Sequence, residues 1–264
     1  MLRNLLERLT RGSAFRRRLP PQFGSRPIYL SADSALSYLK PRWADASRSL
    51  LNAAAAHAAN AKSIWDIGAN CGVFTLAAAH VAAPDAEILA VEADPFLAAL
   101  LQKSTRDPAN SDRSISVLCA AVSDHNGVAR FLIASRGRSS NSLEQSGHRS
   151  QAGGTRFIQH VTTTTLDALL EHFAAPDLIK IDVEGAETIV LAGAVQLLST
   201  VRPVLYIEVG KEQTAEVTTI LHRHNYRLYD GDRADGVPLE ACAYNTLAIP
   251  SERPYRKPPT EVGG

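Results

Sequence analysis

From residue 63 onward, short apolar runs alternate with segments of helical periodicity. The apolar runs have the length and flanking residues of buried strands and cover residues 63–67, 86–94, 114–122, 177–185 and 202–209. Helical patterns over 72–83, 95–107, 186–198 and 215–225 follow most of them, and two further strands are expected at 226–230 and 244–250. This alternation predicts right-handed βαβ crossovers, and so an α/β fold with a mostly parallel sheet and helices on both faces.

Two stretches interrupt the alternation. The sequence AAVSDHNGVARFLI (120–133) has the turn pair Asn126-Gly127 between alternating apolar positions, which predicts a β-hairpin. The segment 135–156 is rich in serine and glycine and carries Arg136, Arg138, Arg149 and Arg156 against only Glu144. A loop that long inside a compact domain is either functional or disordered. The sequence after it predicts a strand entering a helix near Leu166.

Composition narrows the class of protein. The chain has 264 residues, of which 45% are apolar, enough for one domain with extensions. A net charge of +1 argues against a general nucleic-acid binder. Cys71, Cys119 and Cys242 are far apart, which indicates neither a disulfide framework nor a zinc site, so we expect a cytoplasmic protein.

The two ends differ from the middle. Residues 1–20 are rich in arginine, and Leu2, Leu5, Leu6 and Leu9 fall at helical spacing. This basic amphipathic arm is therefore either solvated, weakly bound to a membrane surface or docked on a partner. The tail is rich in proline and polar residues. We therefore expect a basic arm and helical lead-in over 1–60, the main domain over 61–250 and a disordered tail over 251–264.

A glycine corner follows the first strand. The sequence DIGANCGVF places Gly68 and Gly72 around it, and Asn70 stands where a dinucleotide-binding G-x-G-x-x-G motif has its middle glycine. Asp66, just before the corner, repels phosphate and favours an ammonium group. S-adenosylmethionine has an ammonium group, a sulfonium and no phosphate, so the corner favours this donor.

The next two strands fit an adenosyl ligand. Glu92 ends the second strand, where a carboxylate can accept both ribose hydroxyls, although NAD also uses an acid at this place. Ala121 and Val122 follow the third strand and either sandwich the adenine ring or simply pack in the core.

Together, several motifs resemble the FkbM family of S-adenosylmethionine-dependent methyltransferases over about residues 60–250. The motifs are IWDIGANCG, VEADP, AAVSDHNG, TLDALL, PDLIKIDVEGAE, VLAGA and RPVLYIEV, and IKIDVEGAE is the most specific piece. The resemblance implies a Rossmann-like class I methyltransferase domain over 61–250, with a seven-stranded sheet whose last strand is antiparallel. It also implies methyl transfer to oxygen, commonly to a hydroxyl of a sugar or a secondary metabolite.

The resemblance also assigns residues by position. The family's donor-binding turn matches Asp66, Gly68, Asn70 and Gly72, its ribose-binding acid matches Glu92, and its DVEG segment contains Asp182 and Glu184. Cys71 falls at a variable place in the motif, and we interpret it as a bystander.

Methyl transfer to a hydroxyl requires an acceptor oxygen held near the methyl group and a group that removes its proton. Asp182 and Glu184 end the strand expected beside the first one, so they are candidates for base or substrate binding. Two alternatives remain, a cap of the helix that starts at Ala186 and a divalent-cation site. Glu208 is a second candidate for acceptor hydroxyls, whereas Lys180 is expected to be a structural charge and His160 partly exposed.

Two rival functions remain at this stage, an NAD-linked oxidoreductase and a non-catalytic donor-binding module. RNA methylation is weaker, because the sequence has no N-P-P-Y motif and is almost neutral. The expected partner is a small-molecule, sugar or glycan acceptor. The arginines of 135–156 suit an anionic or sugar-bearing one, with the loop closing over the site.

Overall fold

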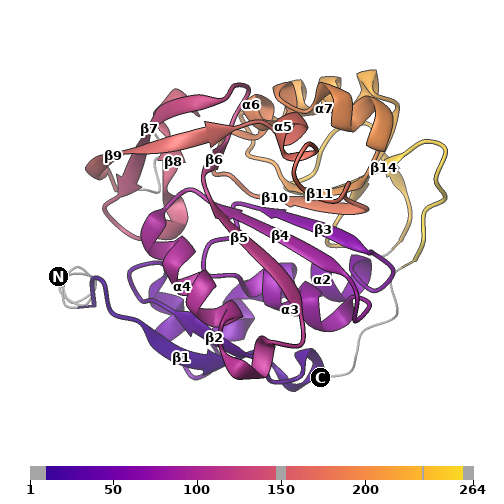
Figure 1. Ribbon diagram of the computed structural model, residues 1–264. Coiled ribbons are helices and arrows are strands. Elements are labelled where there is room, and N and C mark those ends of the chain that lie inside the picture. Colours follow the sequence, from indigo (N-terminus) through magenta and orange to yellow (C-terminus); the bar gives the residue numbers. More distant parts are fainter. Residues whose placement is uncertain (1–9, 147–152, 234, 258–264) are drawn as a thin grey trace.

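The computed structural model describes residues 10–146, 153–233 and 235–257. Its main sheet is formed by β3 (Ser63–Ile67), β4 (Glu87–Glu92), β5 (Ser114–Cys119), β10 (Leu178–Ile181), β11 (Val204–Glu208), β12 (Tyr226–Asp230), β13 (Pro238–Leu239) and β14 (Asn245–Pro250). The strand order is β13-β12-β14-β11-β10-β3-β4-β5 (Figure 1). The predicted βαβ alternation is therefore confirmed.

Strand direction follows the class I methyltransferase pattern. Strands β5, β4, β3, β10 and β11 are parallel neighbours, and β14 is antiparallel to both β11 and β12. The expected seven strands with an antiparallel last strand are present, and the two-residue strand β13 extends the edge beyond β12. The carboxyl ends of β3, β4 and β10 meet at one edge, where an open parallel sheet binds its ligands.

Helices cover both faces of the sheet (Figure 1). On one face lie α2 (Arg48–His57), α3 (Val73–Val81) and α4 (Pro95–Thr105), and on the other lie α5 (Leu166–Leu169), α6 (Glu187–Ala192) and α7 (Thr214–Arg223). Residues alternate between the two cores, since Ile64 of β3 packs with α3 and Trp65 packs with α6. Pro95 begins α4 as predicted, with Asp94 as its N-cap.

The lead-in segment, residues 10–60, packs into the same core as α3. Strands β1 (Phe15–Arg18) and β2 (Pro27–Leu30) form an antiparallel hairpin, followed by the 3-10 turns η2 (Leu36–Leu39) and η3 (Trp43–Ser47). The core side chains of this segment include Phe23, Ile28, Leu30, Trp43 and Leu51. The amphipathic leucines predicted at 2–9 lie outside the described residues.

A second, smaller sheet lies beside the first (Figure 1). Its strands are β6 (Ala121–Val122), β7 (Gly127–Ala134), β8 (Ser142–Leu143) and β9 (Thr155–Thr164), in the order β6-β9-β7-β8. The hairpin predicted at Asn126-Gly127 is wrong, because β9 lies between β6 and β7 and pairs with both. The predicted passage from a strand into a helix near Leu166 is confirmed.

The first part of the predicted loop 135–156 has a regular structure, which includes a short strand of the second sheet. Residues 135–146, called the covering segment here, contain the 3-10 turns η5 (Arg138–Ser140) and η6 (Glu144–Ser146) around β8. Arg149 lies outside the described residues. In the tail, Tyr255 packs against Tyr229 with ring centroids 4.8 Å apart, so the chain is held to the domain at least that far. No helix in the described ranges is long and apolar enough to cross a membrane.

Candidate active site

The glycine corner joins β3 to α3 and is forced by close packing. Gly68 has φ +74°, and a Cβ atom there would lie 1.9 Å from the carbonyl oxygen of Asp182. Gly72 has φ +89°, and its Cβ would lie 2.2 Å from a methyl carbon of Leu101. Only glycine fits these two positions, so the corner brings the end of β3 directly against the end of β10.

Asn70 shapes the corner between the two glycines. Its backbone is left-handed with φ +52°, a conformation that asparagine tolerates better than most residues. Its Oδ1 atom accepts hydrogen bonds from the Cys71 amide at 2.7 Å and the Ser34 hydroxyl at 2.8 Å. Burial raises the pKa of the Cys71 thiol to about 12, which fits its predicted role as a bystander.

Asp66 takes part in a buried ion pair beside the corner. It is fully buried, accepts a hydrogen bond from the Thr75 hydroxyl at 2.5 Å and lies 3.1 Å from the Lys180 ammonium. The charge of Asp66 is thus matched inside the protein by Lys180, and the predicted contact of Asp66 with the donor stays a prediction. A cavity lies at the corner, and the neighbours of Asp66 in the chain, Ile67 and Gly68, form part of its wall.

Lys180 is the centre of this buried arrangement. Its ammonium donates to the Gly68 carbonyl at 2.7 Å and lies 3.5 Å from the Asp182 carboxylate. Burial lowers the pKa of Lys180, but the carboxylates of Asp66 and Asp182 outweigh it and hold the pKa above its ordinary value. Lys180 is thus the structural charge that the sequence predicted, and it ties β3 to β10 beneath the corner.

Glu92 lies at the end of β4 and lines a cavity above the corner. Its two carboxylate oxygens accept hydrogen bonds from the backbone amides of Asn70 at 2.7 Å and Asp94 at 2.8 Å. These bonds fix its direction and leave further lone pairs, because each carboxylate oxygen can accept more than one bond. Burial raises the pKa of Glu92 to about 7, although the two amides lower it.

This pKa predicts a pH-dependent affinity for an adenosyl ligand. The ionised carboxylate is the stronger acceptor for ribose hydroxyls, so affinity for S-adenosylhomocysteine should rise with pH through about 7. At pH 6 binding should be up to ~10-fold weaker than at pH 8. The stability of the free protein runs the opposite way, since a raised carboxyl pKa contributes stability at low pH that is lost as pH rises through 7.

Calorimetric titrations at the two pH values test this expectation. The control is Glu92→Gln. This variant should bind S-adenosylhomocysteine more weakly at both pH values, and its affinity should not change between them. A change of the same size in Glu92→Gln would assign the titration to another group.

The cavity that Glu92 lines, called the first cavity here, also has apolar lining residues. Ala121 and Val122 line it, together with Phe131 of β7 and Leu143 of β8. These four side chains are buried and come from the second sheet, which the sequence had not placed beside the corner. The cavity therefore combines a carboxylate at one end with a slot of aliphatic and aromatic groups, a combination that suits an adenosyl group.

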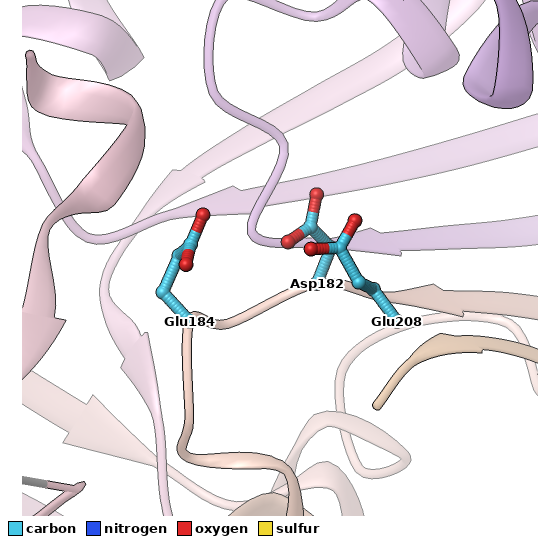
Figure 2. Close-up of side chains that lie close together, drawn as sticks. All are labelled: Asp182, Glu184 and Glu208. Atoms are coloured by element: carbon cyan, nitrogen blue, oxygen red, sulfur yellow. The ribbon is translucent and has the colours of Figure 1, made fainter. Parts of the chain in front are cut away.

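Three carboxylates gather at the carboxyl ends of β10 and β11. Figure 2 shows Asp182 and Glu208 side by side, with Glu184 opposite them on the turn that follows β10. Each offers an oxygen atom that lies within 4.8 Å of one from the others, and all three residues are partly exposed. We call these three residues the acidic cluster. The structure therefore brings together the three residues that the sequence proposed for catalysis.

The geometry also bears on the two alternatives for these acids. Glu184 and Gly185 have φ +53° and +98°, so the chain turns sharply here instead of running extended. Ala186 is the N-cap of α6 and makes no side-chain capping hydrogen bond. This does not test whether Asp182 or Glu184 interacts with the start of α6, so the capping alternative stays open. The cluster has enough oxygen ligands in reach of one another to hold a divalent cation, and this alternative stays open.

The remaining candidates are placed clearly. Glu208 accepts a short hydrogen bond from the Tyr244 hydroxyl, which orients its carboxylate. His160 is exposed on β9 and pairs across the sheet with Arg130, so it belongs to the outer surface of the second sheet.

The sequence did not predict a group of buried ion pairs above the first cavity, which we call the ionic lock. It consists of Arg138 and Arg156 with Asp33 and Asp94. Arg138 of the covering segment donates to Asp33 of the lead-in at 2.8 Å and to Asp94 at 2.5 Å. Arg156 also donates to Asp33 at 2.9 Å. Burial alone raises the pKa of Asp33, but Arg138 and Arg156 hold it below its ordinary value. Two of the four arginines predicted to meet an anionic acceptor, Arg138 and Arg156, are thus bound to carboxylates of the chain itself.

Removing this lock should release the covering segment. In Arg138→Ala we expect hydrogen exchange of residues 138–143 to speed up and affinity for S-adenosylhomocysteine to fall, because Ser139, Asn141 and Leu143 line the first cavity. Arg136→Ala is the matched control, since Arg136 is exposed in the same segment. Equal exchange in both variants would show that the lock does not hold the segment.

Fold and site together define a class I methyltransferase. The sheet order, the glycine corner, the acid that ends β4 and the acids after β10 all fall where that class has them. The sequence also matches the family model of the methyltransferase FkbM domain over residues 66–228, which is more than half of the chain. The chain belongs to the FkbM methyltransferase family.

Several solved methyltransferases are similar at low identity. The FkbM methyltransferase from Methylobacillus flagellatus KT is 17% identical, with a TM-score of 0.44 over 71% of this chain and 43% of that one. The precorrin-6y C5,15-methyltransferase from Geobacter metallireducens GS-15 is 11% identical, with a TM-score of 0.44 over 76% and 86%.

A putative O-methyltransferase from Klebsiella pneumoniae is 16% identical, with a TM-score of 0.38 over 78% of this chain and 70% of that one. A comparison with curated protein sequences gave no match. Similarity at this level says nothing about the methyl acceptor.

Proposed function

We propose that this methyltransferase uses S-adenosylmethionine to methylate a hydroxyl group of a small molecule, sugar or glycan. The observation that carries the proposal is the charge around the first cavity. Its lining includes the carboxylates of Glu92, Asp182 and Glu184, whereas the one basic group among its described lining residues, Arg138, is bound to Asp33 and Asp94. Such a site favours a donor with an ammonium and a sulfonium over a pyrophosphate.

The residues present fit this donor. Glu92 would accept the ribose hydroxyls, Ala121 and Val122 would contact the adenine ring, and the glycine corner lets the ligand approach the backbone closely. When bound, S-adenosylmethionine supplies a methyl group activated by positively charged sulfur.

The acidic cluster supports transfer to oxygen. A carboxylate accepts the hydrogen of a hydroxyl, which orients the oxygen and gives the proton a destination as the new bond forms. Three such groups within 4.8 Å of one another can hold more than one hydroxyl of an acceptor. The covering segment lies over the first cavity and limits the access of water to it.

Ligand binding tests the proposal. S-adenosylhomocysteine should raise the midpoint of thermal unfolding and NAD should not, because the corner lacks the middle glycine and the site is acidic. Stabilisation by NAD alone would restore the oxidoreductase alternative. Donor binding without methyl transfer to any component of a cell extract would instead identify a non-catalytic binding module.

A further inference from the structure

A second cavity extends from the glycine corner towards α3 and the lead-in segment. Its lining shares Gly68, Asn70, Ser139, Asp182 and Glu184 with the first cavity. The two cavities therefore meet at the corner and at two members of the acidic cluster. A donor with its adenosyl group beside Glu92 has its reactive end near this junction, since the carboxyl ends of β3 and β10 lie there.

The far wall of the second cavity comes from the lead-in segment. It is formed by Ala35, Ser37, Tyr38, Ala46, Ser47 and Leu50. All six precede the stretch 66–228 that matches the family model. This wall is thus a feature of the chain's own lead-in, in contrast to the corner and the acids, which lie within the matched stretch.

The lead-in wall of this cavity has an exposed part and a buried part. Ala46 is exposed, whereas Tyr38 and Ser47 are buried, so we take the side of the wall at Ala46 as the mouth of the cavity. Tyr38 packs edge-on against the buried ring of Trp43, with centroids 5.9 Å apart. An aromatic side chain fixed in this way offers a rigid surface at little cost in conformational entropy.

The chemistry of the lining is acidic and rich in hydroxyls. Ser37, Tyr38 and Ser47 contribute hydroxyl groups to the lead-in wall. Lys180 also lines this cavity, but its ammonium contacts Asp66 and Asp182. With Asp182 and Glu184 on the opposite side, the carboxylates outnumber the single lysine among the described lining residues. A phosphate or carboxylate group would be repelled here.

We propose that the second cavity is the acceptor site, that residues 35–50 determine which acceptor is bound, and that the site selects uncharged hydroxyl-bearing acceptors over anionic ones. This inference rests on the proposed function, because it takes the first cavity as the donor site. It replaces the expectation, drawn from the arginines of 135–156, that the acceptor carries a negative charge.

Radiolabelled S-adenosylmethionine and a small-molecule extract test the charge of the acceptor. The labelled product from the unmodified protein should pass through an anion-exchange resin. Retention of the label on the resin would overturn the selectivity. If no product forms although S-adenosylhomocysteine binds, the catalytic function and this inference both fail. If S-adenosylhomocysteine does not bind, the donor assignment itself is wrong.

Blocking the mouth tests the location. Ala46→Trp should lower the yield of labelled product roughly tenfold or more, because a blocked acceptor cannot be positioned for attack. Affinity for S-adenosylhomocysteine should stay within about twofold, which also shows that the variant is folded. The control is Ala215→Trp, an equal change at an exposed alanine of α7, which should leave the yield unchanged.

A smaller side chain at the same position shows whether the yield of labelled product falls with the size of the substitution. Ala46→Ser should lower the yield less than Ala46→Trp does, because the smaller side chain leaves the mouth open. Full yield from Ala46→Trp, with donor affinity unchanged, would place the acceptor elsewhere and overturn the proposal.

Discussion

Asp66→Asn is expected to destabilise the fold by about 3–5 kcal/mol, the range for removing one partner of a buried ion pair. The fully buried Asp66 is 3.1 Å from Lys180, whose ammonium is almost completely buried as well. The substitution leaves the ammonium with the more distant Asp182 carboxylate, 3.5 Å away, in place of the Asp66 charge. Chemical denaturation with urea measures the loss.

Two further variants make this expectation specific. Asp45→Asn removes an exposed ion pair with Arg48, and its effect should be within about 1 kcal/mol. Asp66→Asn combined with Lys180→Met should recover part of the lost stability, because no unpaired charge then remains in the core. If Asp66→Asn is as stable as the unmodified protein but binds S-adenosylhomocysteine more weakly, Asp66 contacts the donor after all.

Asp182→Asn should lower methyl transfer by roughly 10²–10⁴-fold, the contribution usual for a positioned acid or base. Affinity for S-adenosylhomocysteine should change much less, because Glu92 and the glycine corner provide the contacts expected for the adenosyl group. Labelled product from the extract measures transfer, and calorimetry measures donor binding. Glu212→Gln, which alters an exposed acid before α7, is the control and should be neutral.

The cation alternative for the acidic cluster gives a different result. If Asp182, Glu184 and Glu208 hold a divalent ion, a chelator abolishes transfer and added magnesium restores it in the unmodified protein. Transfer that survives both the chelator and Asp182→Asn would exclude both roles for Asp182.

The parts of the site that follow strand ends were predictable from the sequence. The corner, Glu92 and the acids after β10 each come directly after an apolar run, and parallel strands bring such ends to one edge. The ion pair between Asp66 and Lys180 was not predicted, although the sequence contains a signal for it. Asp66 stands two residues before Gly68, and Lys180 stands two residues before Asp182. Asp66 and Lys180 are register partners in the neighbouring strands β3 and β10. Side chains of such partners lie on the same face of the sheet.

The features of the fold and the site that were not predicted depend on contacts between segments that are far apart in the sequence. Asn126-Gly127 has the local chemistry of a hairpin, but β9 supplies a longer partner for β7 and separates it from β6. Asp33 and Arg138 are 105 residues apart, and no periodic pattern connects them. The lead-in has no motif that indicates its site, and only its packing beside α3 brings Tyr38 to the second cavity.

The place of β14 constrains how the sheet is completed during synthesis. β12 leaves the ribosome before β14, yet in the finished sheet it reaches β11 only through β14, which pairs with both. Until residues 245–250 emerge, β11 keeps an open edge of backbone groups that can pair with another chain. The nascent protein is therefore exposed to misassociation at β11 until β14 is inserted, and this insertion closes the edge.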